Sequence, residues 1–449
     1  MRFPPGMPHP KDRTGLTRGQ LLRGAAAAAA GVGVAGGLVA CENTTEPLAV
    51  GCEDPGAGAS SPLVVPKPVG PGGLPLPRTD NSVTWAIVDE NPMIADDLSP
   101  ETGATLKIFN YPDYIWPQVL RRFENRFDCT VAPVATYNSA DEAIAKLQSG
   151  AVEYDVIMGL SGSNIVNLMA LQLLQPLNHT YLPNLPANIW PQLADPFYDR
   201  GSHYTVPYVT WSDGIGWRND LISVDIAELD VPWDIFWESG QWRGRVGLLD
   251  DKRDGLSMPM QRDALAEGRI ADLNTEDPEI VAKAGEDLQQ LTDIANIKVT
   301  ITDYQTLPEG SMYLHHSWSG DLLAGAVQYM PPGVPPDVLS YWWPGTGGVV
   351  QNDFLCVAKA AESPVLAHLF LDFMLDETVA YENFINWNGY LPPQNGVDAD
   401  ALIEEGLIPE TLTTAVVRPD EFLANQQLLQ LTVEGERLWD QAWSAFRAG

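Results

Sequence analysis

Apolar and polar positions alternate along residues 105–170 in the way expected of strands separated by amphipathic helices. Apolar residues over 106–109 predict a buried strand, and apolar side chains that recur on one helical face predict a helix over 116–127. Strands are predicted again over 129–135 and 154–158, and a helix follows each of them. Such a series favours a parallel sheet with helices on its faces.

Two helix starts in this pattern carry capping signals. The helix expected over 139–150 has Ser139 as its N-cap, Glu142 as the capping-box partner three residues later, and a glycine at its end. Ser363, followed by a proline, is expected as the N-cap of a later helix with an apolar inner face.

The alternation weakens beyond this region and then resumes. Strands are predicted over 204–209 and 214–217, on either side of a Trp-Ser-Asp turn. Further strands and helices are predicted over 245–249, 276–291, 312–315, 321–330 and 354–358. No internal repeat stands out, and two α/β lobes fit the length of 449 residues.

Residues 1–40 have the composition of a signal peptide. Arg13, Arg18 and Arg23 precede sixteen small or apolar residues, Ala25–Ala40, a run shorter than the roughly 20 residues that a membrane-spanning helix needs. The sequence Leu-Val-Ala-Cys at residues 38–41 resembles the lipobox of bacterial lipoproteins, so Cys41 is the expected lipidation site. A twin-arginine-like motif has Gly19 in place of its second arginine, which leaves the export route open.

Two further segments are expected before the folded body. Residues 41–80 are rich in proline and glycine and predict an extended, lipidated tether that holds the body off a membrane surface. Residues 81–103 show no clear pattern, and we interpret them as an N-terminal strap.

The charge of the chain restricts its partners. The 59 acidic and 26 basic residues give a formal net charge of −33. A protein this acidic repels the phosphate backbone, so nucleic-acid binding is not expected. The same charge attracts cationic ligands, although most of it is expected to serve as a solvated surface.

The cysteines and histidines do not suggest a metal or cofactor site. Cys52 falls in the tether, whereas Cys129 and Cys356 lie in apolar stretches and are expected to be buried and unpaired. Neighbouring residues on a strand point to opposite faces, so His315 and His316 cannot readily bind one ion. We therefore expect neither a metal nor a cofactor.

Polar loops stand next to several predicted strands, where ligands bind in open α/β sheets. They are Tyr111–Tyr114, Ser161–Ser163, Asp250–Asp254 and Gln351–Asp353. A single aspartate at a helix start usually serves only as an N-cap, but several such loops with aromatic and acidic residues favour a binding site. Trp318, at another strand-to-helix junction, would add an aromatic face for a cation or an alkyl chain.

Ser161 leaves an enzymatic alternative open. A serine between a strand and a helix resembles a nucleophile elbow, but Ser163 stands where the second glycine of G-x-S-x-G belongs. No motif supplies a histidine or an acid for Ser161, so ligand binding or helix capping is the favoured role and a secreted serine hydrolase the less favoured one.

Several of these stretches together resemble one family. Spermidine/putrescine-binding proteins, the solute receptors of polyamine ABC importers, show similar stretches in the same order over residues 104–447. The stretches are LKIFNYPDYIWPQVLRRFE, YDVIMGLSGS, YTVPYVTWSDGIGW, VGLLDDKRD, HSWSGD, WWPGTGGVVQNDFLCVA and NGYLPPQN. The resemblance implies an α/β fold of the type II periplasmic-binding class, with two lobes around a ligand cleft. Lobe 1 would hold residues 104–210 and 352–398, and lobe 2 would hold 211–351 and 399–449.

The resemblance also implies a ligand site. Tyr111 and Trp318 match stacking tryptophans of the family, and Asp251 and Asp254 match its acidic pair for an amine end. The other matched positions are Asp113, Tyr114, Asp353 and Tyr390. Carboxylates would hold the ammonium groups of a polyamine, and aromatic rings would line its methylene stem. Whether Asp113 touches ligand or caps a helix is open.

Departures from the family pattern loosen the identity of the ligand. Gln351 stands where the family often has a tryptophan, and Ser161–Ser163 replace bulkier residues, which predicts a roomier and less aromatic pocket. We expect a monomeric, lipid-anchored receptor, not an enzyme, that delivers a polyamine to a membrane permease. The alternative within this class is another cationic or zwitterionic organic solute.

Overall fold

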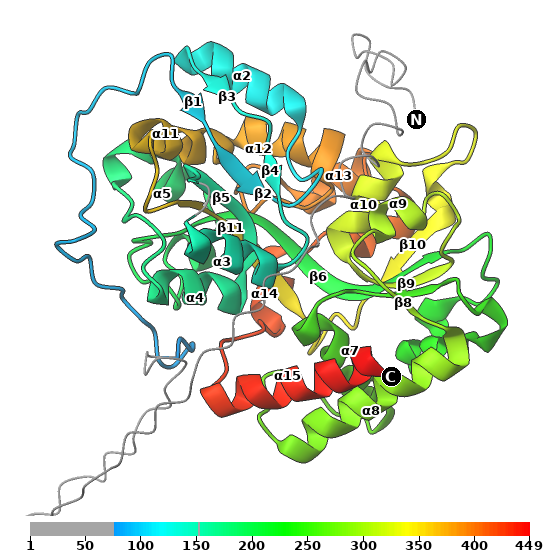
Figure 1. Ribbon diagram of the computed structural model, residues 1–449. Helices are drawn as coiled ribbons and strands as arrows, with labels where there is room; N and C mark the ends of the chain where they lie inside the picture. The colour runs from blue at the N-terminus through cyan, green and yellow to red at the C-terminus, as the bar shows by residue number, and fades with distance from the viewer. Residues whose placement is uncertain (1–75, 151–152) are drawn as a thin grey trace, which may run out of the picture. The chain divides into compact units, whose positions relative to one another are not determined.

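The structure, a computed structural model, describes residues 76–150 and 153–449, which belong to one compact unit (Figure 1). The predicted signal peptide, the lipidation site Cys41 and nearly all of the predicted tether lie outside the described residues. The predicted lobe boundaries stay a prediction.

A mixed sheet forms the centre of the described chain. Its strands follow the order β4–β2–β5–β11–β6–β9–β7–β8, and β10 also pairs with β6. The strands are β2 (Ile108–Asn110), β4 (Ala135–Thr136), β5 (Val156–Ser161), β6 (Val206–Arg218), β7 (Val246–Leu248), β8 (Lys298–Val299), β9 (Leu314–Trp318), β10 (Leu339–Trp342) and β11 (Val350–Val357). A separate parallel pair, β1 (Thr105–Leu106) and β3 (Thr130–Val131), lies outside this sheet. The predicted α/β class is confirmed.

The long strand β6 joins two halves of the sheet. Its residues 206–212 pair with β11, and its residues 213–217 pair with β9, while 215–218 pair with β10. We call β4, β2, β5 and β11 the first half, together with the start of β6. The end of β6 with β9, β10, β7 and β8 forms the second half. Strands β2, β4 and β5 run parallel to one another, as do β7, β8 and β9, which agrees with the alternation in the sequence.

The predicted Trp-Ser-Asp turn is wrong, because β6 runs through it without interruption. Every residue of β6 is buried, and the strand has partners along its whole length. Trp211 pairs with Gln351 on one side of this point, and Asp213 pairs with Trp318 on the other. Pairing partners from distant parts of the chain therefore override the turn preference of the local residues. The predicted strand over 129–135 is likewise two short strands, β3 and β4.

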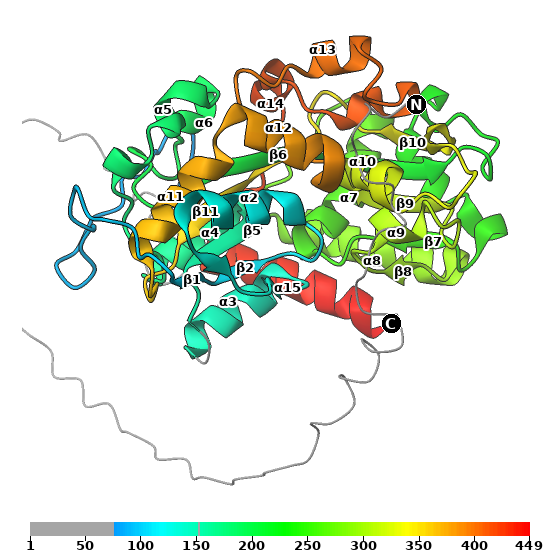
Figure 2. The same cartoon turned by 90° about the horizontal axis from the view of Figure 1, so that it is seen from above.

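Helices cover the sheet, and the helices predicted over 116–127, 139–150, 276–291 and 321–330 all lie close to their predicted ranges. In the first half, α3 and α4 lie on one side of the sheet, and α11 and α12 lie on the other (Figure 1). The longer helices are α2 (Pro117–Phe127), α3 (Ala140–Ser149), α4 (Gly162–Ala170), α7 (Lys252–Ala266), α8 (Pro278–Ala295), α10 (Ser319–Gln328), α11 (Pro364–Met374), α12 (Glu377–Asn383) and α15 (Val433–Ala448). Figure 2 shows the same elements from above, with α15 on the side of α8.

The capping predictions are partly confirmed. Ser139 caps α3, since its hydroxyl accepts a hydrogen bond of 3.2 Å from the backbone N–H of Glu142. The Glu142 carboxylate accepts from the N–H of Asn138 instead of that of Ser139, so the reciprocal half of the box is shifted by one residue. Ser363 precedes α11 without a capping hydrogen bond from its side chain.

Residues 81–103 pack along one region of the body. The backbone N–H of Val83 donates to Phe197 O at 2.8 Å, and the Trp85 indole donates to Tyr198 O at 2.7 Å. Further along, the Asn91 amide donates to Leu174 O at 2.8 Å. These hydrogen bonds tie the segment to the chain that leads from α4 into β6.

Two further predictions concern the interior. Cys129 and Cys356 are both buried and unpaired, as predicted. The hydrophobic core extends through both halves of the sheet and includes Phe123, Trp233 and Trp439 among its fully buried side chains.

Among the residues described, no helix combines the length and apolar character needed to cross a membrane.

Candidate functional site

A cavity opens where the loops after the parallel strands of both halves meet. It contains about 660 Å³ of empty space, and we call it the inner cavity. Eight of the ten predicted ligand residues line it: Tyr111, Tyr114, Ser161, Asp251, Asp254, Trp318, Asp353 and Tyr390. They come from positions between 111 and 390 in the sequence, and the fold brings them to one place.

The strand ends account for this convergence. Tyr111 directly follows β2, and Ser161 ends β5, in the first half of the sheet. Asp251 lies between β7 and α7, and Trp318 ends β9, in the second half. In an open α/β sheet, loops beyond the carboxyl ends of the strands form the usual ligand site.

Asp254 is the most deeply buried acid at the second-half end of the cavity. Its Oδ2 atom accepts a hydrogen bond of 2.8 Å from the Trp318 indole, and its Oδ1 atom has no partner within the described chain. Burial, with the nearby carboxylates of Asp251 and Asp213, raises its pKa well above the ordinary value. A cation against Oδ1 would supply the missing partner and favour the ionised form.

Asp353 lies within β11 in the cavity wall, so the loop predicted over Gln351–Asp353 is wrong: these residues pair with β6 as part of a strand. The Tyr114 hydroxyl donates to its Oδ2 atom at 2.6 Å, and the Trp211 indole donates to its Oδ1 atom at 2.8 Å. Burial raises the pKa of Asp353 to about 7, against the lowering effect of these two hydrogen bonds. The carboxyl group is therefore held firmly in place and titrates near neutral pH.

Asp321 is an acidic residue of the cavity that the sequence analysis did not identify. The Tyr390 hydroxyl donates to its Oδ1 atom at 2.7 Å, and burial together with the neighbouring Asp303 raises its pKa well above the ordinary value. Gly320 permits this contact, because a β-carbon there would come within 2.2 Å of the Tyr390 ring. The strand-to-helix junction that drew attention to Trp318 could also have indicated Asp321.

Aromatic rings connect these carboxylates. Trp211 and Trp318 lie with ring centroids 5.7 Å apart, and Tyr114 lies edge-on to Tyr390 at 5.0 Å. Trp211 and Tyr304 also line the cavity, although neither was predicted to do so. The turn predicted at residues 211–213 gave no reason to expect Trp211 in the wall of the cavity. The rings offer faces for methylene groups and for cations.

Two predicted residues lie outside the inner cavity. Asp113 is exposed, adopts a left-handed conformation with a φ of 57°, and accepts a hydrogen bond of 2.7 Å from the Tyr329 hydroxyl. It does not cap α2 either, since Trp116 is the N-cap and has no capping side chain. Gln351 faces an adjoining cavity, where its amide donates to Leu428 O at 3.1 Å.

The charge of the inner cavity determines what it can hold. Four aspartates line it, Asp251, Asp254, Asp321 and Asp353, and its described lining contains no lysine, arginine or histidine. No cluster of metal-ligating side chains occurs in the part of the chain that the structure describes. The histidine that a Ser161 hydrolase would require is likewise missing from the described lining. Such a lining favours a ligand that combines positive charge with apolar segments.

Comparison with known proteins agrees with this geometry. Residues 118–409, more than half of the chain, match the family model for bacterial extracellular solute-binding proteins. The chain belongs to this family. The family binds solutes outside the cytoplasm, which confirms the predicted receptor class.

Individual relatives of this solute-binding protein cover most of its length. The putrescine/cadaverine-binding protein of Pseudomonas aeruginosa is 25% identical over 346 residues, 75% of this chain and 92% of the relative. The spermidine/putrescine-binding periplasmic protein of Escherichia coli K12 is 24% identical over 352 residues, 77% of this chain and 92% of the relative. Their names agree with the family resemblance stated from the sequence.

The fold of this solute-binding protein also matches solved structures. One is the spermidine/putrescine ABC transporter substrate-binding protein PotD from Streptococcus pneumoniae, with a TM-score of 0.59 and 20% identity. The match covers 77% of this chain and 99% of that one. The predicted type II periplasmic-binding fold is confirmed.

Proposed function

We propose that this solute-binding protein captures a polyamine in the inner cavity and delivers it to the permease of an ABC importer. The ligand would be a linear chain of methylene groups carrying protonated amines, such as putrescine or spermidine. The names of the two relatives in Pseudomonas aeruginosa and Escherichia coli support this ligand class.

The observation that carries the proposal is the charge of the cavity lining. Four aspartates line one cavity whose described lining has no basic side chain to neutralise them, and the pKa values of three of them are raised, mainly by burial. Buried carboxylates without a counter-charge are costly, so a ligand that brings positive charge gains the interaction they otherwise lack.

The arrangement of the acids supports a ligand with separated charges. Asp251 and Asp254 come from the start of α7, whereas Asp321 comes from the start of α10 and bonds to Tyr390. Asp353 lies on a third element, β11, between the rings of Tyr114 and Trp211. A diamine could place its ammonium groups against different acids and its methylene groups against the rings.

Two polar residues of the cavity lining support a second candidate ligand. Ser161 and Asn164 add small polar groups to an otherwise acidic and aromatic wall. Such groups suit a zwitterionic or otherwise substituted cation, for example an amino acid with a basic side chain. We rank this below a simple polyamine, because a ligand carboxylate would face four aspartates.

The proposed receptor is anchored to a membrane by lipid and has no catalytic role. Lipidation of Cys41 would hold the receptor at the membrane surface, and a monomer would suffice for delivery. Catalysis is not part of the proposed function, because Ser161 lines a solute cavity whose described residues include no general base of the histidine type.

Calorimetric titration of the folded protein tests the ligand class. We expect putrescine, cadaverine or spermidine to bind one to one. In contrast, 1,4-butanediol, which has the same stem as putrescine but no charge, should show no binding. Arginine and agmatine test the second candidate in the same experiment. If neither polyamines nor these amino compounds bind to protein that is folded by circular dichroism, the proposed function is wrong.

A further inference from the structure

A second cavity adjoins the inner one and contains about 1070 Å³ of empty space; we call it the outer cavity. The two cavities share five lining residues, Ser161, Asn164, Trp211, Asp251 and Asp254. A ligand that extends past Asp251 and Asp254 from the inner cavity would therefore enter the outer cavity.

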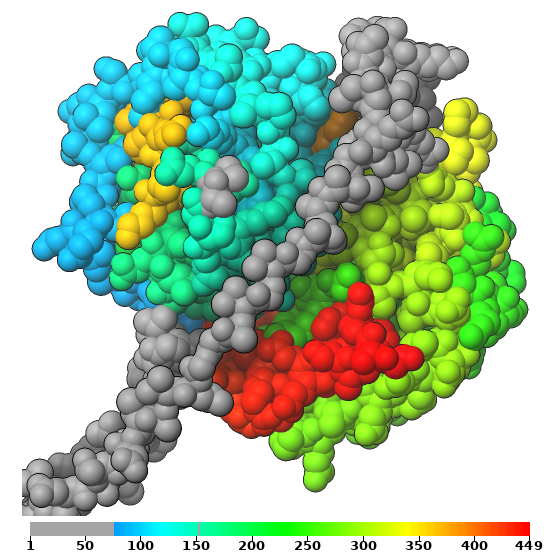
Figure 3. All heavy atoms as spheres, viewed as in Figure 1, coloured from blue at the N-terminus to red at the C-terminus, as the bar shows by residue number. Residues whose placement is uncertain are grey.

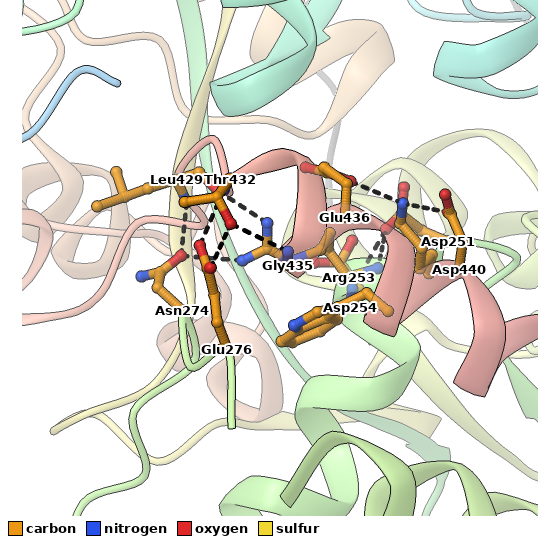
Figure 4. A network of polar contacts seen from close by, with 12 residues as sticks. Asp251, Arg253, Asp254, Asn274, Glu276, Leu429, Thr432, Gly435, Glu436 and Asp440 are labelled. Carbon is orange, nitrogen blue, oxygen red and sulfur yellow. Dashed lines mark hydrogen bonds and ion pairs between the residues drawn. The ribbon is translucent and has the colours of Figure 1, made fainter. Parts of the chain in front are cut away.

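Acidic residues from three elements surround the outer cavity. Asp141 comes from α3, and Asp250 and Asp251 precede α7, while Glu436 and Asp440 come from α15. Figure 3 shows the C-terminal residues, which include α15, at the surface of the molecule. Figure 4 shows Glu436 and Asp440 beside Asp251. Carboxylates separated by almost 300 residues in the sequence thus face one space.

The two basic residues of the described lining, Lys252 and Arg253, have different roles. The Arg253 guanidinium donates to Leu429 O, Leu273 O and Asn274 Oδ1, and it stacks over the Trp439 ring at 4.4 Å. These hydrogen bonds join α7 to residues 273–274 and to Leu429, and none of them goes to an acid of the cavity (Figure 4).

The Lys252 ammonium, in contrast, is bound by acids of the outer cavity. Its Nζ atom lies 2.9 Å from Glu436 and 2.6 Å from Asp440. Burial lowers the pKa of Lys252, but the two carboxylates outweigh this effect and leave the pKa above its ordinary value. The lysine side chain is an ammonium group on four methylenes, which is chemically the aminobutyl arm of a polyamine.

We propose that Lys252 is a specificity-determining residue, whose ammonium group occupies the position that a third ammonium of a longer polyamine would take. This inference rests on the proposed function. A diamine fits within the inner cavity and leaves Lys252 in place. A triamine that reaches past Asp251 meets a like charge and finds Glu436 and Asp440 already bound to the Lys252 ammonium, so the protein prefers diamines.

Two buried oxygen atoms in the wall of the outer cavity could accept further hydrogen bonds from a ligand. Asp254 and Gln351 are each 3% exposed, and both line the outer cavity. Asp254 Oδ1 and Gln351 Oε1 have no hydrogen-bond partner among the residues described. Without Lys252, these acceptors and the two acids of α15 would be available to an additional ligand ammonium.

The test compares putrescine with spermidine by calorimetry in the wild-type protein and in Lys252→Met. We expect the wild-type protein to bind putrescine more tightly. In Lys252→Met, the ratio of the two dissociation constants should shift by about tenfold or more toward spermidine, because a nearby like charge is removed. Lys252→Arg keeps the charge and should keep the wild-type preference.

Lys283→Met is the matched control, since Lys283 also bridges two carboxylates, Asp263 and Asp287, but lines neither cavity. It should leave the ratio unchanged. If Lys252→Met does not fold, Lys252→Gln replaces it. The preference of the wild-type protein for putrescine over spermidine also tests the role of Lys252. An unchanged ratio, or a wild-type preference for spermidine, overturns the role of Lys252 and leaves the proposed function intact. Failure of both amines to bind overturns the proposed function, and this inference with it.

Discussion

At the scale of single residues, the site combines groups that position one another. Tyr114 and Trp211 each donate a hydrogen bond to Asp353, and Trp318 donates to Asp254. The aromatic residues therefore do more than contact the ligand, since they also hold the carboxylates in place. Holding charged groups rigidly before binding reduces the ordering cost when the ligand arrives.

The raised pKa of Asp353 predicts that ligand binding releases protons. At pH 7 a carboxyl group with a pKa of about 7 is half protonated, and a bound cation favours its ionised form. Binding at pH 7 should therefore release up to about half a proton from Asp353, and affinity should fall as the pH drops below 7. Calorimetry of putrescine binding in phosphate and in Tris, whose ionisation enthalpies differ, measures this release.

The pH prediction has a definite sign, because the ligand binds the deprotonated carboxylate. Affinity should rise between pH 5 and 7 and change less above pH 8, where Asp353 is already ionised. The same heat of binding in both buffers at pH 7 would contradict the assignment of Asp353 to the ligand site.

At the scale of elements, the start of α7 combines a structural and a binding role. The backbone N–H groups of Arg253 and Asp254 both donate to Asp251 Oδ1, at 2.7 and 3.2 Å, so Asp251 caps the helix. The same residue lines both cavities. An effect of mutating Asp251 on ligand binding could therefore come from its charge or from a frayed helix.

Two substitutions at Asp251 separate these roles. Asp251→Ser keeps a capping oxygen but removes the charge, so we expect weaker amine binding with nearly unchanged stability. Asp251→Ala removes both, and should also lower the free energy of unfolding by about 1 kcal/mol. Thermal unfolding and calorimetry of both variants measure the two effects. If Asp251→Ser binds putrescine like the wild-type protein, Asp251 is only a helix cap.

The sequence predicted elements better than it predicted their connections. The helices α2, α3 and α8 lie close to their predicted ranges, because their apolar periodicity is local information. The course of β6 through Trp211 and Asp213 was missed, because partners more than 100 residues away keep it extended. Local turn chemistry could not reveal those partners.

The candidate site likewise depends partly on local sequence patterns and partly on contacts between distant parts of the chain. Seven of the eight predicted residues that line the inner cavity stand beside predicted strands, where ligands bind in open α/β sheets, whereas Tyr390 was matched only through the family resemblance. The position of Lys252 could not be predicted in this way. It depends on α15 packing near α7, about 185 residues later, which brings Glu436 and Asp440 to the ammonium group.

At the scale of the whole described unit, one hydrogen bond crosses the rim of the inner cavity. Asp113 follows β2 in the first half, and Tyr329 follows α10 beside the second half. Pro112, which precedes Asp113 in the sequence, lines the cavity. So does Tyr304, whose ring centroid lies 5.3 Å from that of Tyr329. This bond links the two halves at the edge of the proposed ligand site.

Removing this bond should speed ligand release. In Tyr329→Phe we expect the dissociation rate of putrescine to rise about two- to fivefold, since an exposed hydrogen bond to a carboxylate contributes about 0.5–1 kcal/mol. Stopped-flow measurement of dissociation gives this rate.

Tyr181→Phe is the control, because the Tyr181 hydroxyl also makes exposed hydrogen bonds, donating to Ala95 O and accepting from the backbone N–H of Leu98, but away from the cavity. It should leave the dissociation rate unchanged. Equal rates in the two variants would show that the Asp113–Tyr329 bond has no part in retaining the ligand.

The central claim is that buried aspartates of the inner cavity hold the ammonium groups of a polyamine. The most direct test is calorimetric titration of putrescine into the wild-type protein and Asp254→Asn at pH 8. We predict one-to-one binding to the wild-type protein. In Asp254→Asn, binding should be weaker by at least about thirtyfold, because loss of one partner of a buried charge pair costs about 2 kcal/mol or more. Equal affinities in two folded proteins would contradict the account.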